Sequence, residues 1–160
     1  MALSKKLLGA HFRYPDYYMV EREKAREYAN AVKNTDAVFF SDDAAAELGY
    51  SGLPAPLTFI SMFGYVAQVA SFTHHGITLA DHKIVHVDQV LKFQRPIKCG
   101  DKLYCDVYVH EIRQAHGTDI VVNKVLITND DGDVVQETYT TLAGRSGEED
   151  GESGFSDGTA

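Results

Sequence analysis

Hydrophobic and polar residues recur with two different periods along this chain, and the change of period divides it in two. In residues 21–33 the apolar positions return every three or four residues, with charged residues between them, which predicts an amphipathic helix. A second, short helix is predicted over residues 42–48, because Ser41 or Asp42 can cap its start and Gly49 can end it. The first half of the chain is therefore predicted to be mainly helical.

Residues 57–72 carry apolar side chains on nearly every face of the helix that they are predicted to form. Pro56 suits the first turn of this helix, and Gly76 follows its end. A helix that is apolar all round is expected to be buried all round. Its length of roughly 24 Å, at 1.5 Å per residue, is enough to form the core of a small domain.

The second half of the chain has the two-residue period of β-strands. Residues 102–112 alternate between apolar and polar side chains, and residues 84–93 and 118–128 are rich in β-branched residues. The sequence Asn129-Asp-Asp-Gly132 is typical of a hairpin turn, which residues 133–143 follow as the returning strand. A long buried helix wrapped by an antiparallel sheet predicts an α+β fold.

Composition and charge narrow the classes of function. The chain has 160 residues and a formal net charge of −8. We predict one domain over residues 1–144 and an acidic, disordered tail over residues 145–160. A nucleic-acid partner is not expected, because phosphate binding requires clustered Lys and Arg. No apolar run is long enough for a signal peptide or a membrane span, so we expect a cytoplasmic protein whose two cysteines are free thiols.

Neither a metal site nor a cofactor site is predicted. His82 and His86 have the spacing of ligands on a helix, but His86 lies in a predicted strand, and no Cys or carboxylate completes a ligand set. His74 and His75 follow the predicted central helix, where the helix dipole favours a cation. The glycines form none of the nucleotide-binding patterns.

Several segments carry a resemblance to a known family. Residues 40–50, 52–59 and 93–103 resemble the framework of the MaoC-type (R)-specific enoyl hydratases and dehydratases. Further segments, among them Tyr14-Pro-Asp-Tyr17 and Glu137-Thr-Tyr-Thr-Thr-Leu-Ala-Gly144, make almost the whole chain similar to the HadA-type subunits of mycobacterial-type type II fatty acid synthase. The resemblance implies the hotdog fold and the dehydration of (3R)-hydroxyacyl groups on acyl carrier protein, in fatty acid and mycolic acid elongation.

The residues that carry the chemistry of that family are missing. Dehydration of a 3-hydroxyacyl thioester requires a base for the α-proton and an acid for the departing hydroxyl. The family has an Asp and, five residues later, a His. These positions fall on Asn34 and Phe39 here, or on Asp36 and Ser41 if the register shifts by two. The resemblance therefore implies no catalytic residue in this chain, and a HadB-type catalytic subunit that completes a heterodimer.

Small and polar residues form a stripe along the predicted central helix, at intervals of three or four residues. Such a stripe suits either close packing of the helix or the wall of an acyl channel, in which small side chains leave room for the substrate. We predict that the substrate-binding residues are Thr58, Ser61, Phe63, Gly64, Tyr65 and Gln68.

Two other functions remain open. The chain is alternatively a homodimeric acyl-binding or scaffolding protein without lyase activity, or a self-sufficient hydratase that uses Asp36. The simpler interpretation of Asp36 is a turn or cap residue. Carrier proteins are acidic, as this chain is. Docking is therefore expected at a local basic patch formed by Lys92, Arg95 and Lys98, or on the partner subunit.

Overall fold

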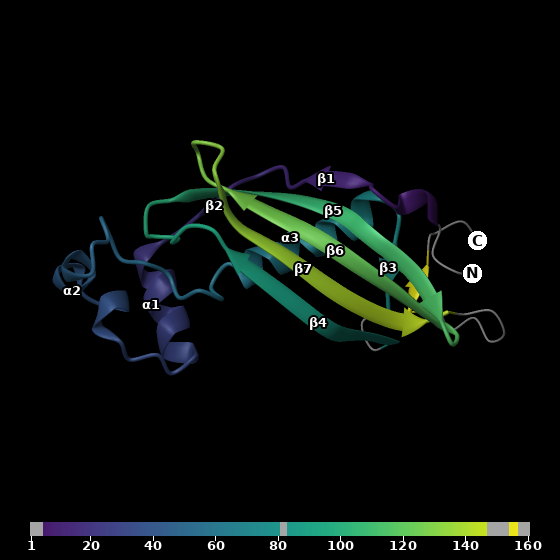
Figure 1. Ribbon diagram of the computed structural model, residues 1–160, viewed down its shortest axis with the longest axis horizontal. Helices are drawn as coiled ribbons and strands as arrows, with labels where there is room; N and C mark the ends of the chain where they lie inside the picture. The colour runs from purple at the N-terminus through teal and green to yellow at the C-terminus, as the bar shows by residue number, and fades with distance from the viewer. Residues whose placement is uncertain (1–4, 81–82, 147–153, 157–160) are drawn as a thin grey trace.

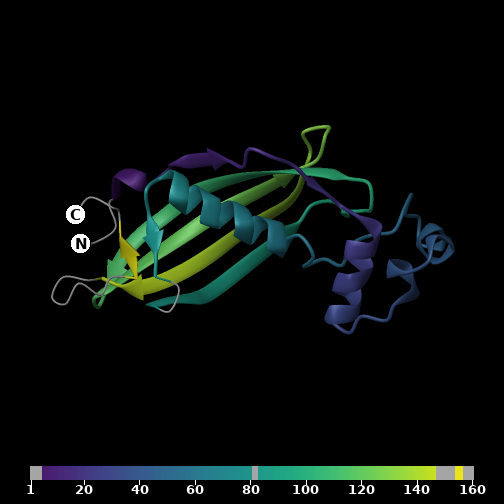
Figure 2. The same cartoon turned by 180° about the vertical axis from the view of Figure 1, so that it is seen from behind.

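The structure is a computed structural model that describes residues 5–80, 83–146 and 154–156. One long helix, α3 (Ser61–His74), lies against one face of a single antiparallel sheet (Figures 1 and 2). This two-layer arrangement confirms the α+β fold that the sequence predicts.

Four long strands of the sheet come from the second half of the chain, and two short strands come from the first half. Its strand order is β1-β5-β6-β7-β4, and the short β2 also pairs with β5. The strands are β1 (His11–Arg13), β2 (Tyr18–Met19), β4 (Ile84–Phe93), β5 (Lys102–Ala115), β6 (Thr118–Thr128) and β7 (Val134–Arg145). The predicted hairpin joins β6 to β7, where the Asn129 side chain accepts a hydrogen bond from the backbone N–H of Asp133, at 2.9 Å.

Two shorter helices lie beyond one end of the sheet (Figure 1). They are α1 (Arg22–Ala31) and α2 (Asp42–Glu47), close to their predicted bounds. The hydroxyl oxygen of Ser41 caps α2 by accepting a hydrogen bond from the backbone N–H of Ala44, at 3.4 Å. Two short 3₁₀ turns, η1 (Lys5–Leu7) and η2 (Ala37–Phe39), complete the first half. Among the described helices, none is long and apolar enough to cross a membrane.

Helix α3 begins four residues later than expected, and Pro56 lies outside it. The preceding segment is extended and pairs with the loop after β4: the N–H of Ala55 donates to the carbonyl of Ile97, and the N–H of Cys99 donates to the carbonyl of Leu53, both at 2.8 Å. Residues 57–60 form turns instead of helix: the N–H of Phe59 donates to the carbonyl of Pro56 at 2.9 Å, and the N–H of Ser61 donates to that of Thr58 at 3.1 Å.

The expectation that this helix is buried on all sides is wrong. Phe63 and Ala67 pack into the main core against Val107 of β5, but Tyr65 and Val66 are 64% and 48% exposed. The physical reason is that the sheet covers only one face of α3, and the rest of the described chain leaves the opposite face open to solvent (Figure 2).

The predicted disordered tail is corrected at one point. Phe155 and Ser156 form a short strand, β8, which pairs with β3 (Thr78–Leu79), and the Phe155 ring is fully buried. A buried aromatic ring offsets the entropy cost of ordering the chain around it. Residues 147–153 and 157–160, the rest of that tail, lie outside the described residues, as does His82.

Candidate functional site

The positions of the missing acid and base lie in η2 and the residues before it. The backbone N–H of Asp36 donates to the Asn34 side chain at 3.1 Å, and Oδ1 of Asp36 accepts from the N–H of Val38 at 3.2 Å. Asp36 therefore caps η2, as the simpler sequence interpretation expects. Phe39 ends the same turn and presents a hydrocarbon ring where the family resemblance places an imidazole.

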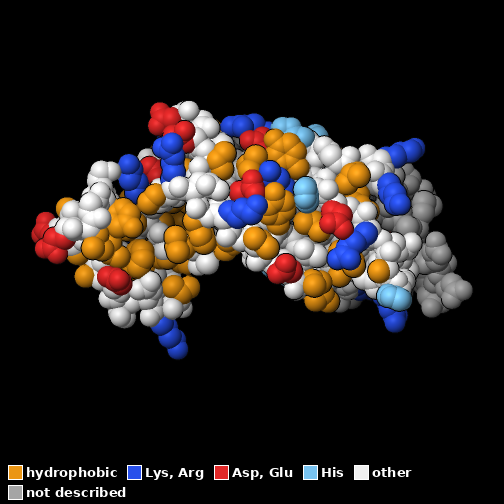
Figure 3. Space-filling model, viewed as in Figure 1, with side chains coloured by type: hydrophobic (Ala, Val, Ile, Leu, Met, Phe, Trp, Pro, Cys, Tyr) orange, Lys and Arg blue, Asp and Glu red, His pale blue; other side chains and the backbone are white. Residues whose placement is uncertain are grey.

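A cavity of about 450 Å³ opens beside this turn. It lies between the helical segment, by which we mean residues 22–47 with α1, η2 and α2, and the end of the sheet. Asp36 and Phe39 line it together with apolar residues that include Leu48, Phe93 and Pro96. Hydrophobic side chains also gather over the helical end of the molecule and its junction with the sheet (Figure 3). No histidine is among the lining residues within the described parts of the chain. The cavity can hold apolar groups, and its described lining does not contain the Asp–His pair that the family resemblance implies.

Gln136 of β7 is the most buried polar side chain of this cavity, at 2% exposure. Its Nε2 donates to the hydroxyl of Thr138 at 3.0 Å, and its Oε1 has no hydrogen-bond partner within the described residues. Sequence reasoning missed Gln136. The available signal was the spacing of Gln136, Thr138 and Thr140, three polar residues at every second position and therefore on one face of the strand.

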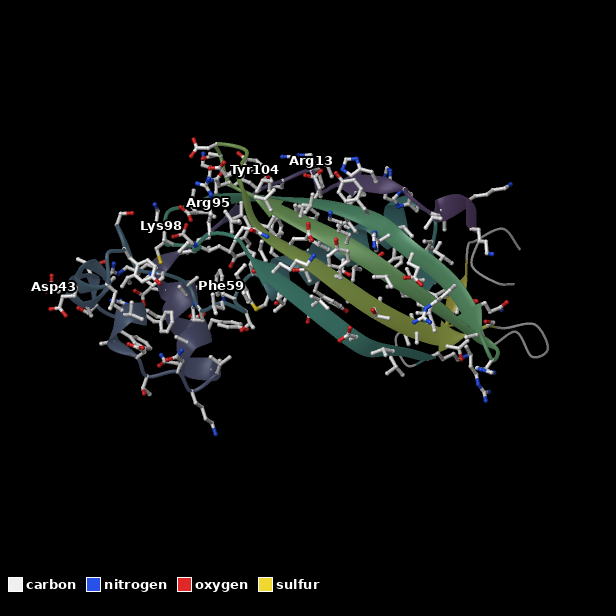
Figure 4. All side chains as sticks on the ribbon, viewed as in Figure 1. Arg13, Asp43, Phe59, Arg95, Lys98 and Tyr104 are labelled. Atoms are coloured by element: carbon white, nitrogen blue, oxygen red, sulfur yellow. The ribbon has the colours of Figure 1, made fainter. Side chains whose placement is uncertain are left out.

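The predicted basic patch is largely neutralised by its neighbours. Arg95 forms an ion pair with Asp133 at 2.8 Å, and Lys92 forms one with Glu137 at 2.9 Å. Lys124 approaches the same glutamate at 3.1 Å, so hydrogen bonds from the two ammonium groups lower the pKa of Glu137 to about 2. Arg95 and Lys98 lie between the helical segment and the sheet (Figure 4).

A second cavity, of about 270 Å³, lies between α3 and the β7–β4 side of the sheet. Three of the six predicted substrate-binding residues, Ser61, Tyr65 and Gln68, line it. It continues between Phe72 of α3 and Leu142 of β7. The structure thus brings half of the predicted set together along one side of the helix, on a partly apolar cavity. We call this space the α3 cavity.

The other three predicted residues are not among those that line the α3 cavity. Thr58 is exposed, and its Oγ1 accepts a hydrogen bond from the Tyr28 hydroxyl at 2.9 Å. The ring of Phe63 is in the core, in edge contact with Tyr14. Gly64 faces the sheet, where a Cβ atom would lie 3.9 Å from a methyl group of Val125. For Gly64, close helix packing is the interpretation that the contacts support.

A row of polar side chains crosses the sheet at the α3 cavity, buried on β6 and β7 and exposed on β4. Asn123, Thr140 and Gln89 are register partners on β6, β7 and β4, and the last two line the cavity. Nδ2 of Asn123 donates to Oε1 of Gln68 at 3.3 Å, and Nε2 of Gln68 donates to the carbonyl of Gly64 at 3.2 Å. Buried polar atoms of this kind can hydrogen-bond a polar group that enters the cavity.

Both cysteines are free thiols, as predicted. Cys105 is fully buried in the core beneath α3, and this burial raises its thiol pKa to about 12. Burial also raises the pKa of Cys99, which is only partly covered. A thiol of such a high pKa is a poor nucleophile at neutral pH. Cys105 is therefore a packing residue.

Comparisons with known proteins agree with this geometry. Residues 6–138 match a family model described as "FAS1-like, dehydratase domain region". A UPF0336 protein of Mycobacterium tuberculosis is 66% identical over the full length of both chains, and one of Mycobacterium leprae is 64% identical over the same span.

Solved structures place the chain among hydratases and dehydratases. A chain of the C-terminally truncated HadBC (3R-hydroxyacyl-ACP dehydratase) complex of Mycobacterium tuberculosis is 46% identical, with a TM-score of 0.80 over 89% of this chain and all of that one. A MaoC-like dehydratase is 32% identical, with a TM-score of 0.76 over 88% of this chain and 42% of that one. These matches confirm the predicted MaoC-like hotdog fold.

Proposed function

This chain belongs to the family of FAS1-like dehydratase regions, and from that premise we propose that it is the acyl-binding, non-catalytic subunit of a heterodimeric (3R)-hydroxyacyl-ACP dehydratase. In this proposal the chain is of the HadA type and its partner of the HadB type, and the complex acts in fatty acid and mycolic acid elongation. One observation carries it: Phe39 lines the cavity where the acid–base pair of the family is expected.

The contacts of Asp36 support the absence of catalytic chemistry in this protomer. A general base must reach the proton that it removes, and its acid partner must reach the leaving hydroxyl. Asp36 already uses one carboxylate oxygen as a cap, and the described lining of its cavity holds no histidine to act with it. The described lining of this cavity thus offers one carboxylate and no histidine, and His86 lines the separate α3 cavity, so we propose that the acid and base come from the partner.

The exposed apolar surface supports a partner subunit. Tyr65 and Val66 project from the uncovered face of α3, while Val85 and Val87 are 63% and 60% exposed on β4. β4 is an edge strand of ten residues that pairs only with β7 within the described chain. A long apolar edge is a template for pairing with another chain. We propose that the catalytic subunit covers these two surfaces.

The α3 cavity is the site that we assign to the acyl chain. Ser61, Tyr65 and Gln68 line its α3 side, and Phe72 and Leu142 make its deeper part apolar. Burial of each methylene contributes about 0.8 kcal/mol, so a cavity of this kind selects substrates by length. Because Lys92 and Arg95 are neutralised by carboxylates, we assign docking of the acidic carrier protein mainly to the partner.

The decisive experiment compares this chain alone with the chain co-expressed with a HadB-type catalytic subunit. Hydration of a trans-2-enoyl thioester is followed for both preparations. Activity only in the co-expressed complex is the expected result, because the acid and base are then supplied in trans. Asp36→Asn keeps an oxygen that can cap η2 and removes the ionisable group, so this variant of the complex is expected to retain full activity.

Two outcomes would replace the proposal. Activity of the isolated chain that Asp36→Asn abolishes would make it a self-sufficient hydratase. Inactivity of both preparations, together with a stable homodimer that binds a fluorescent fatty acid, would make it an acyl-binding protein without lyase activity. The oligomeric state is read from size-exclusion chromatography with light scattering.

A further inference from the structure

The deep end of the α3 cavity is closed by an apolar wall at the C-terminal end of α3. Phe72 of α3, Leu79 of β3 and Leu142 of β7 line the cavity there. Phe72 also belongs, with Phe155, to a separate apolar cluster, and Leu79 and Leu142 pack against that cluster. Strands β3 and β8 lie together at the end of α3, across the end of the sheet (Figure 2). The wall of the cavity is thus backed by a residue from the last six positions of the chain.

The position of Phe155 is fixed by several independent contacts. Leu79 is its register partner in the β3–β8 pair, and its ring centroid lies 6.3 Å from that of Phe72. The adjoining Gly154 donates its N–H to the carbonyl of Arg145 at 2.9 Å and accepts from the N–H of Ala80 at 3.0 Å.

A glycine on β7 leaves the room that the ring occupies. A Cβ atom at position 144 would lie 2.9 Å from Cε2 of Phe155 and 3.1 Å from Cδ2. Real Cβ atoms essentially never approach a ring so closely, so the ring requires glycine at this position. The ring of Phe155 is completely buried, although the surrounding segment has the composition of a solvated tail. The fold therefore contains a buried site that fits the ring of Phe155.

We propose that Phe155 is a positioning residue that sets the depth of the α3 cavity and thereby the longest acyl chain that the protein accepts. Phe155 does not line the cavity. It supports Phe72, Leu79 and Leu142 from behind, and these side chains can retreat if the ring is removed. The inference rests on the proposed function in one respect, namely that the α3 cavity holds the acyl chain.

The test uses the full chain in complex with a HadB-type subunit, and compares wild type with Phe155→Leu and Phe155→Ala. The value of kcat/KM is measured for trans-2-enoyl thioesters from short to long acyl chains. For lengths beyond the wild-type optimum, the ratio of long-chain to short-chain kcat/KM is expected to rise about fourfold for each methylene that becomes buried. The change should appear mainly in KM, because the reacting carbons lie at the other end of the substrate.

Ile112→Ala is the matched control, because Ile112 packs against the same apolar cluster but does not line the cavity. It is expected to lower the melting temperature without changing the profile of activity against chain length. Gly144→Ala is the second variant, in case Phe155→Ala fails to fold. The added methyl would meet both the ring and the Cα atom of Gly154, at 2.9 and 3.1 Å, so it must displace the ring and should change the profile relative to wild type.

Identical length profiles for wild type, Phe155→Leu and Gly144→Ala in an active complex would overturn the inference. A separate measurement keeps it distinct from the proposed function. The isolated chain is titrated with fluorescent fatty acids of increasing length, and Phe155→Leu should bind the longer probes more tightly than wild type. If the wild-type complex is inactive but this shift occurs, the proposed function fails and the role of Phe155 stands.

Discussion

At the scale of single residues, the contacts of a side chain decide which of its possible roles it fills. Asp36 suits both a catalytic acid and a turn cap by residue type, and its hydrogen bond to the N–H of Val38 makes it a cap. For Phe39 the residue type alone excludes a role in proton transfer, because a hydrocarbon ring has no proton to give or accept. The role of Glu137 is visible only in the structure. Lys92 and Lys124, on the two strands beside it, both form ion pairs with its carboxylate.

The first prediction concerns the pH dependence of stability at Glu137. Its pKa is about 2 in the folded protein against an ordinary value of 4.5, because Lys92 and Lys124 favour its charged form. The lower folded value means that the stabilisation is present above about pH 4.5 and is lost as the pH falls to about 2. Glu137→Gln should lower the free energy of unfolding at pH 7 by about 1 kcal/mol, the scale of two partly exposed ion pairs.

The measurement is thermal unfolding of wild type and variant across this pH range, where the difference should shrink toward acid pH. Glu111→Gln provides the control, since Glu111 is half-exposed and pairs only with Arg113, at 3.2 Å, among the ion pairs that the structure describes. A difference between Glu137→Gln and wild type that stays constant down to pH 2 would contradict the assignment.

The second prediction concerns thiol reactivity. Cys105 is fully buried with a raised pKa, whereas Cys99 is partly exposed. Native protein at pH 8 should therefore incorporate one equivalent of a thiol reagent, at Cys99, and Cys99→Ser should incorporate none until denaturant is added. Mass spectrometry of the labelled peptides identifies the site. Rapid labelling of Cys105 in the native protein would show that the core beneath α3 opens.

At the scale of elements, the sequence pattern predicts some properties of helix α3 and not others. Its apolar composition identifies it as the core helix, and its C-terminal end near His74 and Gly76 is close to the predicted one. The pattern does not report which face the sheet covers, because apolar residues occur on all of them. The pattern also does not show that residues 57–60 form turns before the helix begins at Ser61.

The third prediction tests how closely α3 packs on the sheet at Gly64. A Cβ atom there would lie 3.9 Å from Val125, an ordinary contact distance. Gly64→Ala should therefore raise the free energy of unfolding by about 0.5–1 kcal/mol, because alanine restricts the unfolded chain and favours the helix. Gly64→Leu should lower it by about 1–3 kcal/mol, since the larger side chain forces α3 away from β6.

Urea unfolding followed by circular dichroism measures both changes at Gly64. Ser71, a buried residue on the same helix, serves as the reference through Ser71→Ala, which removes a hydroxyl without adding volume. Equal stability of the alanine and leucine variants at position 64 would mean that the helix and the sheet are not in close contact there.

At the scale of the whole molecule, the domain buries apolar side chains on one side of α3 and leaves apolar side chains exposed on the other. The sheet buries one face of α3, while the opposite face and the edge strand β4 present apolar side chains to solvent. Apolar surface of this kind marks an interaction site in soluble proteins. This uncovered surface agrees with the similarity to a chain of the two-subunit HadBC complex and supports a partner subunit.

The fourth prediction concerns that subunit. Val66→Glu places a charge on the uncovered face of α3 and should weaken association with the HadB-type partner at least tenfold, because an interface core excludes unpaired charges. Val32→Glu is the control, since Val32 is 49% exposed against 48% for Val66 and lies at the end of α1. Both variants should keep the melting temperature of the isolated chain. Association is measured by analytical ultracentrifugation, and equal affinities would remove this face from the interface.

The sequence by itself determined the class of fold, the order of the main helices and strands, and the presence of Phe39 where the family resemblance places a histidine, because periodicity, caps and residue chemistry are local properties. It also predicted six substrate-binding residues in or beside the central helix, among them Ser61, Tyr65 and Gln68. Only the tertiary structure decided that these three share a cavity with Thr140, that Gly64 instead touches β6, and that Phe155 folds back from an acidic tail. Those outcomes depend on contacts between residues distant in sequence, which no local pattern encodes.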